Sequence, residues 1–174
     1  MMPPQFACPG PLLARGMTVR PECAMDLPAL RTLFSTQRWA EFAMLPWDDA
    51  AKQALLDQQF DAQQRHYTSA YAHRQFLVLL DRERLAGRLY LGDSAAGDLC
   101  VLDILLSPDH RNRGVGTALL AAVQDQAATA GRRVLLEVDK GNPAAGLYRR
   151  LGFAAVGDTD TSWRMAWSAA TTQG

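Results

Sequence analysis

The sequence predicts a single α/β domain. Short segments with the alternating apolar pattern of strands are separated by segments whose apolar residues recur at helical spacing. Their order along the chain is β-α-α-β-β-β-α-β-α-β-β. A length of 174 residues suits one domain with a sizeable core. Hydrophobic residues make up 48% and charged residues 21%, which is ordinary for a globular protein.

The domain is expected to span residues 17–168, between two tails. Residues 1–16, MMPPQFACPGPLLARG, lack the apolar stretch of a secretory signal peptide and are expected to form a disordered tail. Met17 is a second candidate for the first residue of the natural protein. Residues 169–174 are expected to form a short C-terminal tail. No internal repeat or second-domain boundary is visible in the sequence.

The N-terminal part of the domain predicts a strand followed by a helix. Residues 18–21 form the strand. Asp26 is a suitable N-cap for a helix over residues 27–37, and Pro28 is tolerated in its first turn. Helical spacing is carried by four apolar residues, Leu27, Leu30, Leu33 and Phe34.

Residues 39–47, WAEFAMLPW, are too aromatic for a solvated linker. Packing in the core and lining of a substrate pocket are both open interpretations of this segment. Asp48 or Asp49 then begins a long helix to about residue 72, with an apolar stripe of Leu56, Phe60, Tyr67 and Tyr71. His66 on this helix is expected to face solvent, because no second histidine stands at i+4 to share a metal.

The middle of the chain predicts a hairpin and a further strand. Residues 75–80 and 85–91 alternate on either side of a polar turn. Because residues of like parity share a face of a strand, Arg88 and Tyr90 project together. The next strand covers residues 98–106, and Pro108 ends it.

The loop after this strand predicts an anion site. It contains two arginines, Arg111 and Arg113, and two glycines, Gly114 and Gly116, before an alanine-rich helix over residues 114–130. Glycine lets the backbone approach a ligand, and a helix N-terminus offers unpaired N–H groups with partial positive charge. Phosphate or pyrophosphate is the natural ligand. A tight turn without a ligand is the alternative.

Two better-known phosphate motifs do not fit this loop. A P-loop needs a lysine after its last glycine, and none follows Gly116. A dinucleotide-binding loop needs a third glycine, and Leu119 stands in its place.

The C-terminal part predicts a strand, a short helix and a hairpin. Residues 133–138 are apolar enough for a central strand. Asn142 and Pro143 suit the N-cap and first position of the helix, and Gly152 ends it. The hairpin is formed by residues 153–156 and 162–167.

Charge and cysteine content narrow the function classes. A net charge of +0 gives no bulk attraction to nucleic acid or to a membrane surface, so neither is expected as a partner. No apolar run approaches transmembrane length. The three cysteines, Cys8, Cys23 and Cys100, cannot all pair within one chain, which favours a reducing, cytoplasmic compartment.

Two segments of the sequence together resemble a known family. Arg111 to Gly116 is similar to the R/Q-x-x-G-x-G/A motif of the GNAT superfamily of N-acetyltransferases. The later residues Asn142-Pro143-Ala144, Leu147-Tyr148 and Leu151-Gly152-Phe153 resemble that family's N-P-A…L-Y…L-G-F segment. The resemblance runs from about residue 17 to 167. It implies a mostly antiparallel central sheet flanked by helices, with the fourth and fifth strands splayed apart.

The resemblance further implies acetyl-CoA as co-substrate and an amine on a small molecule or peptide as acceptor. Pantetheine would pair with the backbone of Leu105 and Leu106, and the N–H of Leu106 would stabilise the oxyanion. Asn142 would cap its helix and contact the pantetheine arm. A homodimer is a family-level expectation, and no metal is expected. Pyrophosphate would bind at Arg111, Asn112, Arg113, Gly114, Val115, Gly116 and Thr117.

Tyr148 is the candidate general acid for the departing thiolate. A thiol has a pKa of about 8.5 and a tyrosine about 10, so proton donation is close to balanced. A purely packing role for Tyr148 is the alternative.

The general base stays open. Asp103 lies on the strand before the loop, and a structural pair with Arg88 explains it equally well. Glu41 is a second candidate, with a solvated surface carboxylate as its alternative, and water is a third. Two non-enzymatic functions also stay open: an acyl-CoA-binding or sensing module of the same fold, and an interaction domain without affinity for CoA.

Overall fold

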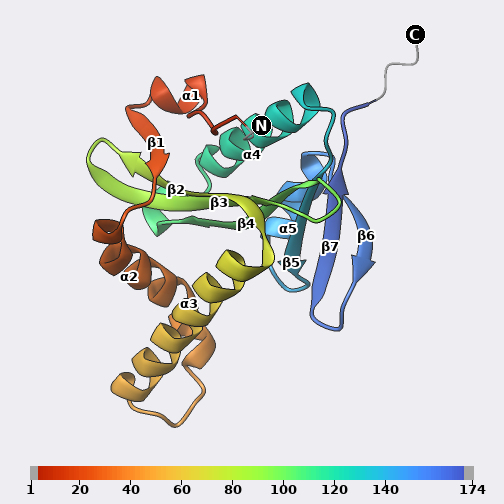
Figure 1. The fold of residues 1–174 in the computed structure, drawn as a ribbon. Coiled ribbons are helices and arrows are strands. Elements are labelled where there is room, and N and C mark those ends of the chain that lie inside the picture. Colours follow the sequence, from red (N-terminus) through yellow and green to blue (C-terminus); the bar gives the residue numbers. More distant parts are fainter. Residues whose placement is uncertain (1–3, 171–174) are drawn as a thin grey trace.

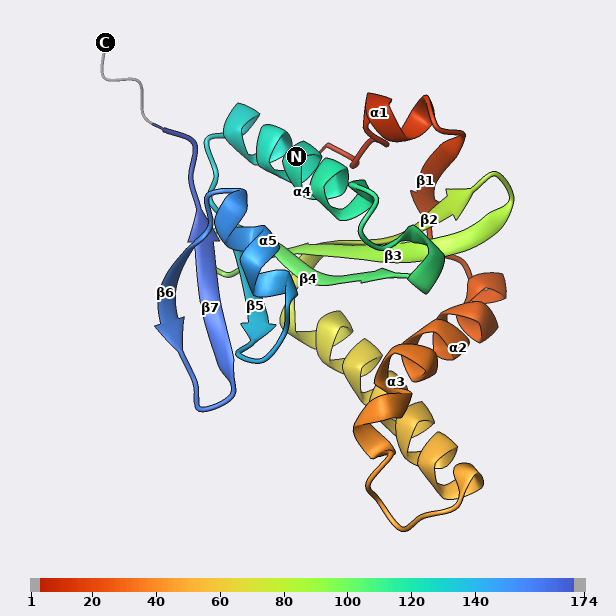
Figure 2. The ribbon, with the colours of Figure 1, turned by 180° about the vertical axis from the view of Figure 1, so that it is seen from behind.

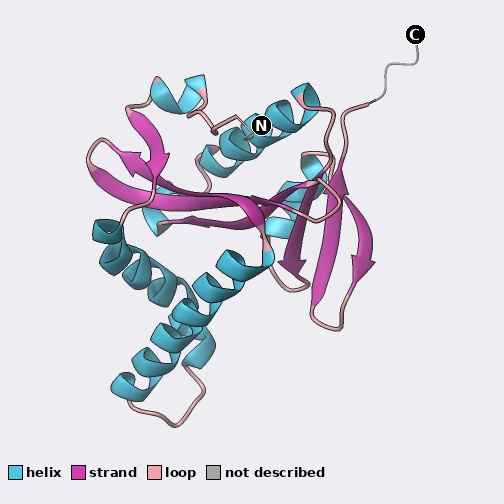
Figure 3. Cartoon of the chain, viewed as in Figure 1, coloured by secondary structure: helices cyan, strands magenta, loops and turns pink. Residues whose placement is uncertain are grey.

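The computed structural model describes residues 4–170. It contains one seven-stranded sheet in the order β1-β2-β3-β4-β5-β7-β6, with helices on both faces (Figures 1 and 3). The strands are β1 (Met17–Pro21), β2 (Ala72–Asp81), β3 (Arg84–Asp93), β4 (Leu99–Leu106), β5 (Val134–Asp139), β6 (Ala154–Asp158) and β7 (Ser162–Trp167). The helices are α1 (Gly10–Leu13), α2 (Leu27–Arg38), α3 (Asp49–Ala70), α4 (Val115–Thr129) and α5 (Ala144–Arg150). Short 3₁₀ turns are η1 (Ala24–Asp26), η2 (Trp39–Phe42) and η3 (Pro108–His110).

The sheet is antiparallel except at its centre. β1 to β4 form an antiparallel meander, and β5, β7 and β6 are joined antiparallel. β4 and β5 are parallel and pair only through Leu99–Val101 and Val134–Leu136. Beyond Val101 the two strands separate. The predicted fold class and the splay of the fourth and fifth strands are therefore confirmed.

Two hydrophobic cores cover the two faces of the sheet, because successive strand residues point to opposite sides. On β2, Leu77 and Leu79 belong to the core under α1, α4 and α5, whereas Val78 belongs to the core under α2 and α3. Phe34 and Phe60 meet edge to face in the second core, with ring centroids 5.5 Å apart. Figure 2 shows the two helix layers on opposite faces of the sheet.

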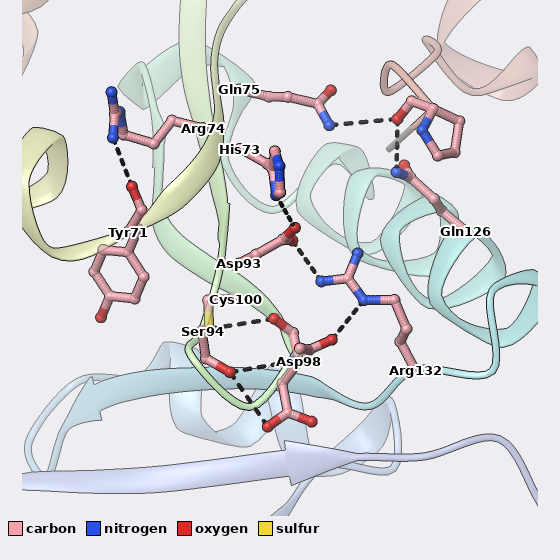
Figure 4. Close-up of polar contacts among 12 residues, drawn as sticks. Tyr71, His73, Arg74, Gln75, Asp93, Ser94, Asp98, Cys100, Gln126 and Arg132 are labelled. Carbon is pink, nitrogen blue, oxygen red and sulfur yellow. Dashed lines mark hydrogen bonds and ion pairs between the residues drawn. The ribbon is translucent and has the colours of Figure 1, made fainter. Parts of the chain in front are cut away.

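The N-terminal segment departs from the sequence expectation. The disordered tail predicted for residues 1–16 is wrong for residues 4–16, whereas residues 1–3 lie outside the described part. Leu12 in α1 is 0% exposed and Phe6 is 5% exposed. The carbonyl of Pro4 accepts hydrogen bonds from Gln126 at 3.0 Å and Gln75 at 3.4 Å, which holds the segment against α4 and β2 (Figure 4). Prolines and glycines interrupt the segment, so its apolar residues show no helical or strand period that would predict this packing.

Most helix and strand positions agree with the sequence within a few residues, but the predicted caps of α2 and α5 differ. Asp48, one of the two predicted candidates, caps α3 by accepting from Ala51 N at 2.8 Å. Asp26 does not cap α2 with its side chain. Its carboxylate accepts from Cys23 N and pairs with Arg20, both at 2.8 Å, because η1 precedes the helix and turns Asp26 inward.

Within the described residues, no helix has the length and apolar character needed to cross a membrane. Of the C-terminal tail expected over residues 169–174, residues 169 and 170 have no regular structure, and the remainder lies outside the described part.

Candidate active site

The closed end of the gap between β4 and β5 is held by ion pairs. Asp98 precedes β4 and Arg133 precedes β5, and the two side chains form a two-point pair at 2.9 and 3.0 Å. Arg132 contacts Asp93 and donates to the carbonyl of Gly97 at 2.7 Å (Figure 4). These contacts fix the point from which the two strands separate.

The backbone that faces the open part of the gap follows from the β3–β4 register. Ser107 N donates to Ala86 O at 2.8 Å, so this pair is hydrogen-bonded across the ladder. Since antiparallel hydrogen-bonded and non-bonded pairs alternate, the peptide groups of Ile104 and Leu106 turn away from β3 and towards the gap. The structure differs from the sequence expectation at Leu105, whose peptide group faces β3.

The carbonyl of Leu106 already has a partner. Arg111 donates to it through Nε at 3.1 Å and reaches Gln37 Oε1 through Nη2 at 3.3 Å. The loop after β4 is thereby tied to the end of α2. The N–H of Leu106 stays directed at the gap.

The loop between β4 and α4 has the geometry of an anion site. Asn112 and Gly114 have φ of 57° and 76°, and a left-handed residue is least strained as glycine. The first helical hydrogen bond is from Ala118 N to Gly114 O at 3.0 Å. The N–H groups of Val115, Gly116 and Thr117 therefore have no intrahelical partner.

The loop also has room for a ligand at Gly116. A Cβ atom built there would lie 3.6 Å from Leu147 and 3.8 Å from Leu106, which are ordinary contact distances. The absence of a side chain is therefore not required by the protein's own packing. A helix N-terminus with free N–H groups and a bare backbone fits a phosphate group.

A polar cleft of about 650 Å³ lies between the end of α2, α3, and the separated strands. Its lining includes four residues predicted for the site, Glu41, Asp103, Asn142 and Tyr148, and none of the loop residues 111–117. The structure therefore brings the candidate acid, both candidate bases and Asn142 to one cleft, with the anion site as a separate region at the N-terminus of α4.

Tyr148 lies on α5 at the base of this cleft and is 6% exposed. Its ring packs edge to face on Phe153, with centroids 5.9 Å apart. Within residues 4–170, no hydrogen-bond partner is found for its hydroxyl. Burial, with a smaller contribution from the charge of Asp103, raises the pKa of Tyr148 to about 12. The phenol is therefore protonated at neutral pH but is a weaker acid than the sequence-based argument assumed.

Asp103 is paired with Arg88, as one of the two sequence interpretations required. Arg88 is 0% exposed and donates from Nε to Asp103 Oδ2 at 2.6 Å, while Nη2 also reaches Gln63 Oε1 at 2.6 Å. The guanidinium lies 4.5 Å from the centroid of the Tyr90 ring, so Arg88 and Tyr90 do share a face. Asp103 therefore compensates a buried charge as well as lining the cleft.

Glu41 and Asn142 have different surroundings. Glu41 is exposed on η2 at the edge of the cleft. In the same aromatic segment, Phe42 is buried in the core and Glu41 lines the cleft, whereas Met44 and Trp47 are exposed outside the cleft lining. Asn142 Oδ1 accepts from Ala144 N at 2.9 Å, but the N-cap of α5 is Pro143 rather than the predicted Asn142, because the helix begins at Ala144, one residue later than predicted.

Sequence reasoning missed the contribution of α3 to the cleft. Gln63, His66 and Tyr67 stand at i, i+3 and i+4, so they share one helix face, and all three line the cleft. Tyr67 donates to the carbonyl of Leu102 at 2.9 Å. The spacing was visible, but it was interpreted only as an apolar stripe. His66 is exposed, as predicted, although its exposed side faces the cleft.

An anion site and a polar cleft at one gap between two strands define the architecture of a group-transfer enzyme with a phosphate-bearing donor. Comparison with known families identifies the class: the model of the acetyltransferase (GNAT) family matches residues 36–153. The chain belongs to the GNAT acetyltransferase family. No curated protein sequence matches it.

Solved structures of the family share the fold at low identity. The PaiA N-acetyltransferase from Thermoplasma acidophilum, solved with coenzyme A, is 17% identical with a TM-score of 0.66, covering 88% of this chain and 99% of its own. An acetyltransferase from Thermus thermophilus is 21% identical with a TM-score of 0.60, and the match covers 88% of this chain and 97% of that structure. RimL, a ribosomal L7/L12 alpha-N-protein acetyltransferase, is 16% identical with a TM-score of 0.61, and the match covers 88% of this chain and 91% of RimL.

Proposed function

We propose that this acetyltransferase moves the acetyl group of acetyl-CoA to a primary amine by direct attack within a ternary complex. The observation that carries the proposal is the placement of an anion site and a polar cleft at one gap between strands. Direct attack needs donor and acceptor bound together, and two separate regions beside one opening allow this. Acetyl-CoA would supply the activated acetyl thioester.

The donor would be held by backbone groups. The free N–H groups of Val115, Gly116 and Thr117 would bind the pyrophosphate, with positive charge from Arg111 and Arg113. The peptide groups of Ile104 and Leu106, rather than Leu105, would pair with the pantetheine arm. Asn142 lines the cleft and would contact the same arm.

Leu106 would stabilise the charge that develops on the acetyl carbonyl. Its N–H is directed at the gap, and a fixed N–H is most effective where charge appears in the transition state. Arg111 holds the carbonyl of the same residue at 3.1 Å, which stiffens this part of the backbone.

Tyr148 would donate a hydrogen bond to the departing thiolate. With a pKa of about 12, its hydroxyl retains its proton at neutral pH. Complete transfer to a thiolate whose conjugate acid has a pKa of about 8.5 is unfavourable, so we assign Tyr148 to stabilising the thiolate while solvent supplies the final proton.

The amine must lose a proton before it can attack. Glu41 and Asp103 both line the cleft, and Asp103 also neutralises Arg88. Since the pair with Arg88 already accounts for Asp103, Glu41 or a water molecule is the better candidate for the base.

For the acceptor, the compartment and the oligomeric state we propose only a general class. A small-molecule or peptide amine, a cytoplasmic location and a possible homodimer are consistent with the family. Neighbouring structures differ in their acceptors. RimL is a protein acetyltransferase, and FdhC is a nucleotide-linked sugar GNAT. FdhC is 15% identical to this chain with a TM-score of 0.63, and the match covers 88% of this chain and 87% of FdhC. Nucleic acid and membranes are not proposed as partners.

An acyl-CoA-binding module is the second candidate function. It is favoured by the pairing of Asp103 with Arg88 and by the raised pKa of Tyr148, both of which weaken acid–base chemistry. The two functions differ in turnover. Incubation with acetyl-CoA and a panel of amines, with detection of the free thiol, separates them: CoA affinity without thiol release in the presence of any amine supports the module.

CoA is expected to stabilise the fold under either function. Binding to the native state alone adds RT ln(1 + [L]/Kd), or about 2.7 kcal/mol at 100-fold saturation. Thermal unfolding with and without CoA measures this. An unchanged melting temperature at millimolar CoA would contradict the donor site and with it both functions.

A further inference from the structure

We propose that Arg15 belongs to the donor site and binds the phosphate groups of CoA together with the loop arginines. The proposal rests on the proposed function, since it assumes that the loop at the N-terminus of α4 holds CoA. Arg15 lies outside residues 36–153, the part that matches the family model. The N-terminal segment would then be an added element of the donor site in this chain.

A direct contact joins Arg15 to the loop. Arg15 Nη1 donates to the carbonyl of Arg113 at 2.9 Å, across 98 positions of sequence. Arg113 stands between Asn112 and Gly114, which both have positive φ, so the loop backbone here is tightly turned. The guanidinium of Arg15 is therefore within hydrogen-bond distance of the segment that presents its N–H groups to phosphate.

The position of Arg15 is set by the packed segment that carries it. Three residues before it, Leu12 is fully buried in the same core as Val115 and Leu119 of α4. One residue after it, the carbonyl of Gly16 accepts from Arg82 N at 3.0 Å. Figures 1 and 2 both show α1 beside α4. The backbone on both sides of Arg15 is therefore held, which limits the positions that its exposed side chain can reach.

The charges around Arg15 favour an anion. Within residues 4–170, none of Arg15, Arg111 and Arg113 has a carboxylate partner. The nearby carboxylate of Asp81 is 2.9 Å from His110 Nε2, and the hydrogen bond from His110, with smaller contributions from the charges of Arg82 and Arg15, lowers the pKa of Asp81. Arg15 contacts the loop that leads into the N-terminus of α4, the positive end of its dipole, whereas the guanidinium of Arg111 is held by Leu106 and Gln37. A guanidinium has five N–H donors, of which Arg15 uses one on Arg113. CoA, with a pyrophosphate and a 3′-phosphate, provides the counter-charge.

The test measures CoA binding by calorimetry at several salt concentrations. Arg15→Ala is expected to weaken CoA binding by about fivefold to tenfold, the effect of one solvent-exposed charged hydrogen bond. It should also reduce the dependence of Kd on ionic strength, because one screened attraction has been removed. Arg15→Lys should restore the salt dependence. Arg65→Ala removes an arginine from the exposed face of α3 and is the matched control, with unchanged Kd.

The outcomes separate this inference from the proposed function. If the unmodified protein fails to bind CoA, the proposed function fails. If it binds CoA and Arg15→Ala binds within twofold of it, the inference about Arg15 is wrong and the N-terminal segment only supports the fold. Weaker binding with an unchanged salt dependence would also overturn it, because the loss would then come from loop shape rather than charge. The melting temperature of the ligand-free variant should stay unchanged, since Arg15 is exposed.

Discussion

At the scale of single residues, Tyr148 separates an enzyme from a binding module. Tyr148→Phe removes one hydroxyl and keeps the ring that packs on Phe153. If the hydroxyl stabilises the thiolate only in the transition state, kcat should fall by about 10²–10³-fold while the Kd for CoA stays nearly constant. The measurement is kcat with the best amine found, beside calorimetry of CoA. An unchanged kcat with chemistry rate-limiting would restrict Tyr148 to packing.

Substitutions at Asp103 and Arg88 test, also at the residue scale, whether the role of Asp103 is structural or catalytic. Asp103→Asn leaves the buried guanidinium of Arg88 without its counter-charge and should destabilise the protein by about 3–5 kcal/mol. Urea unfolding measures this. Arg88→Met removes the buried charge but retains the carboxylate. If Asp103 is structural, activity in both variants should follow the folded fraction; activity lost only in a fully folded Asp103→Asn would make Asp103 the base.

At the scale of elements, the N-terminus of α4 makes the donor site testable through Gly116. A Cβ at this position meets no close neighbour, so Gly116→Ala should retain the fold. The side chain would project where we place pyrophosphate, and Gly116→Val should crowd it further. We expect progressive loss of the CoA-induced rise in melting temperature from glycine to alanine to valine. A valine variant with the full rise in melting temperature would place the phosphates elsewhere.

The elements also show what a single sequence can predict. Apolar residues at helical spacing predicted α2, α3 and α4, and the alternating segments predicted β2 and β3. Resemblance to the GNAT family pointed to Tyr148 and Asp103, and the shared strand face of Arg88 and Tyr90 followed from their parity. The orientation of the Leu105 peptide group could not be predicted, because it depends on the register with β3 and a shift of one residue reverses it.

At the scale of the whole molecule, the N-terminal segment contributes to stability. A chain that begins at Met17 would lose Phe6 and Leu12 and expose the apolar surface that they cover. Removing two buried large side chains should cost about 3–6 kcal/mol, at roughly 1.5–3 kcal/mol each. Denaturant unfolding of the shortened and full chains measures the difference. Equal stability would mean that the segment packs without contributing.

Residues 4–16 also mark the limit of pattern-based prediction at this scale. Phe6 and Leu12 are held by contacts with β2 and α4, which are distant in the sequence. Local spacing contains no information about such contacts. The cleft could not be predicted for the same reason. Its lining comes from several elements that are distant in the sequence, so single residues could be proposed for the site but their meeting in one cleft could not.

The seam between β4 and β5 has a consequence for native-state hydrogen exchange. Among the described residues, the strand ladder between β4 and β5 has three residue pairs, Leu99–Val134, Cys100–Leu135 and Val101–Leu136, and the ion pairs at its closed end and the shared core supply the other contacts between β1–β4 and β5–β7. Cooperative units often follow such boundaries, so β5, β6 and β7 should open as one group at a lower free energy than β2 and β3. If CoA binds across both groups, as we propose, it should slow amide exchange in both and bring their opening energies together. Equal protection before CoA is added would show that this short seam already joins the sheet into one cooperative unit.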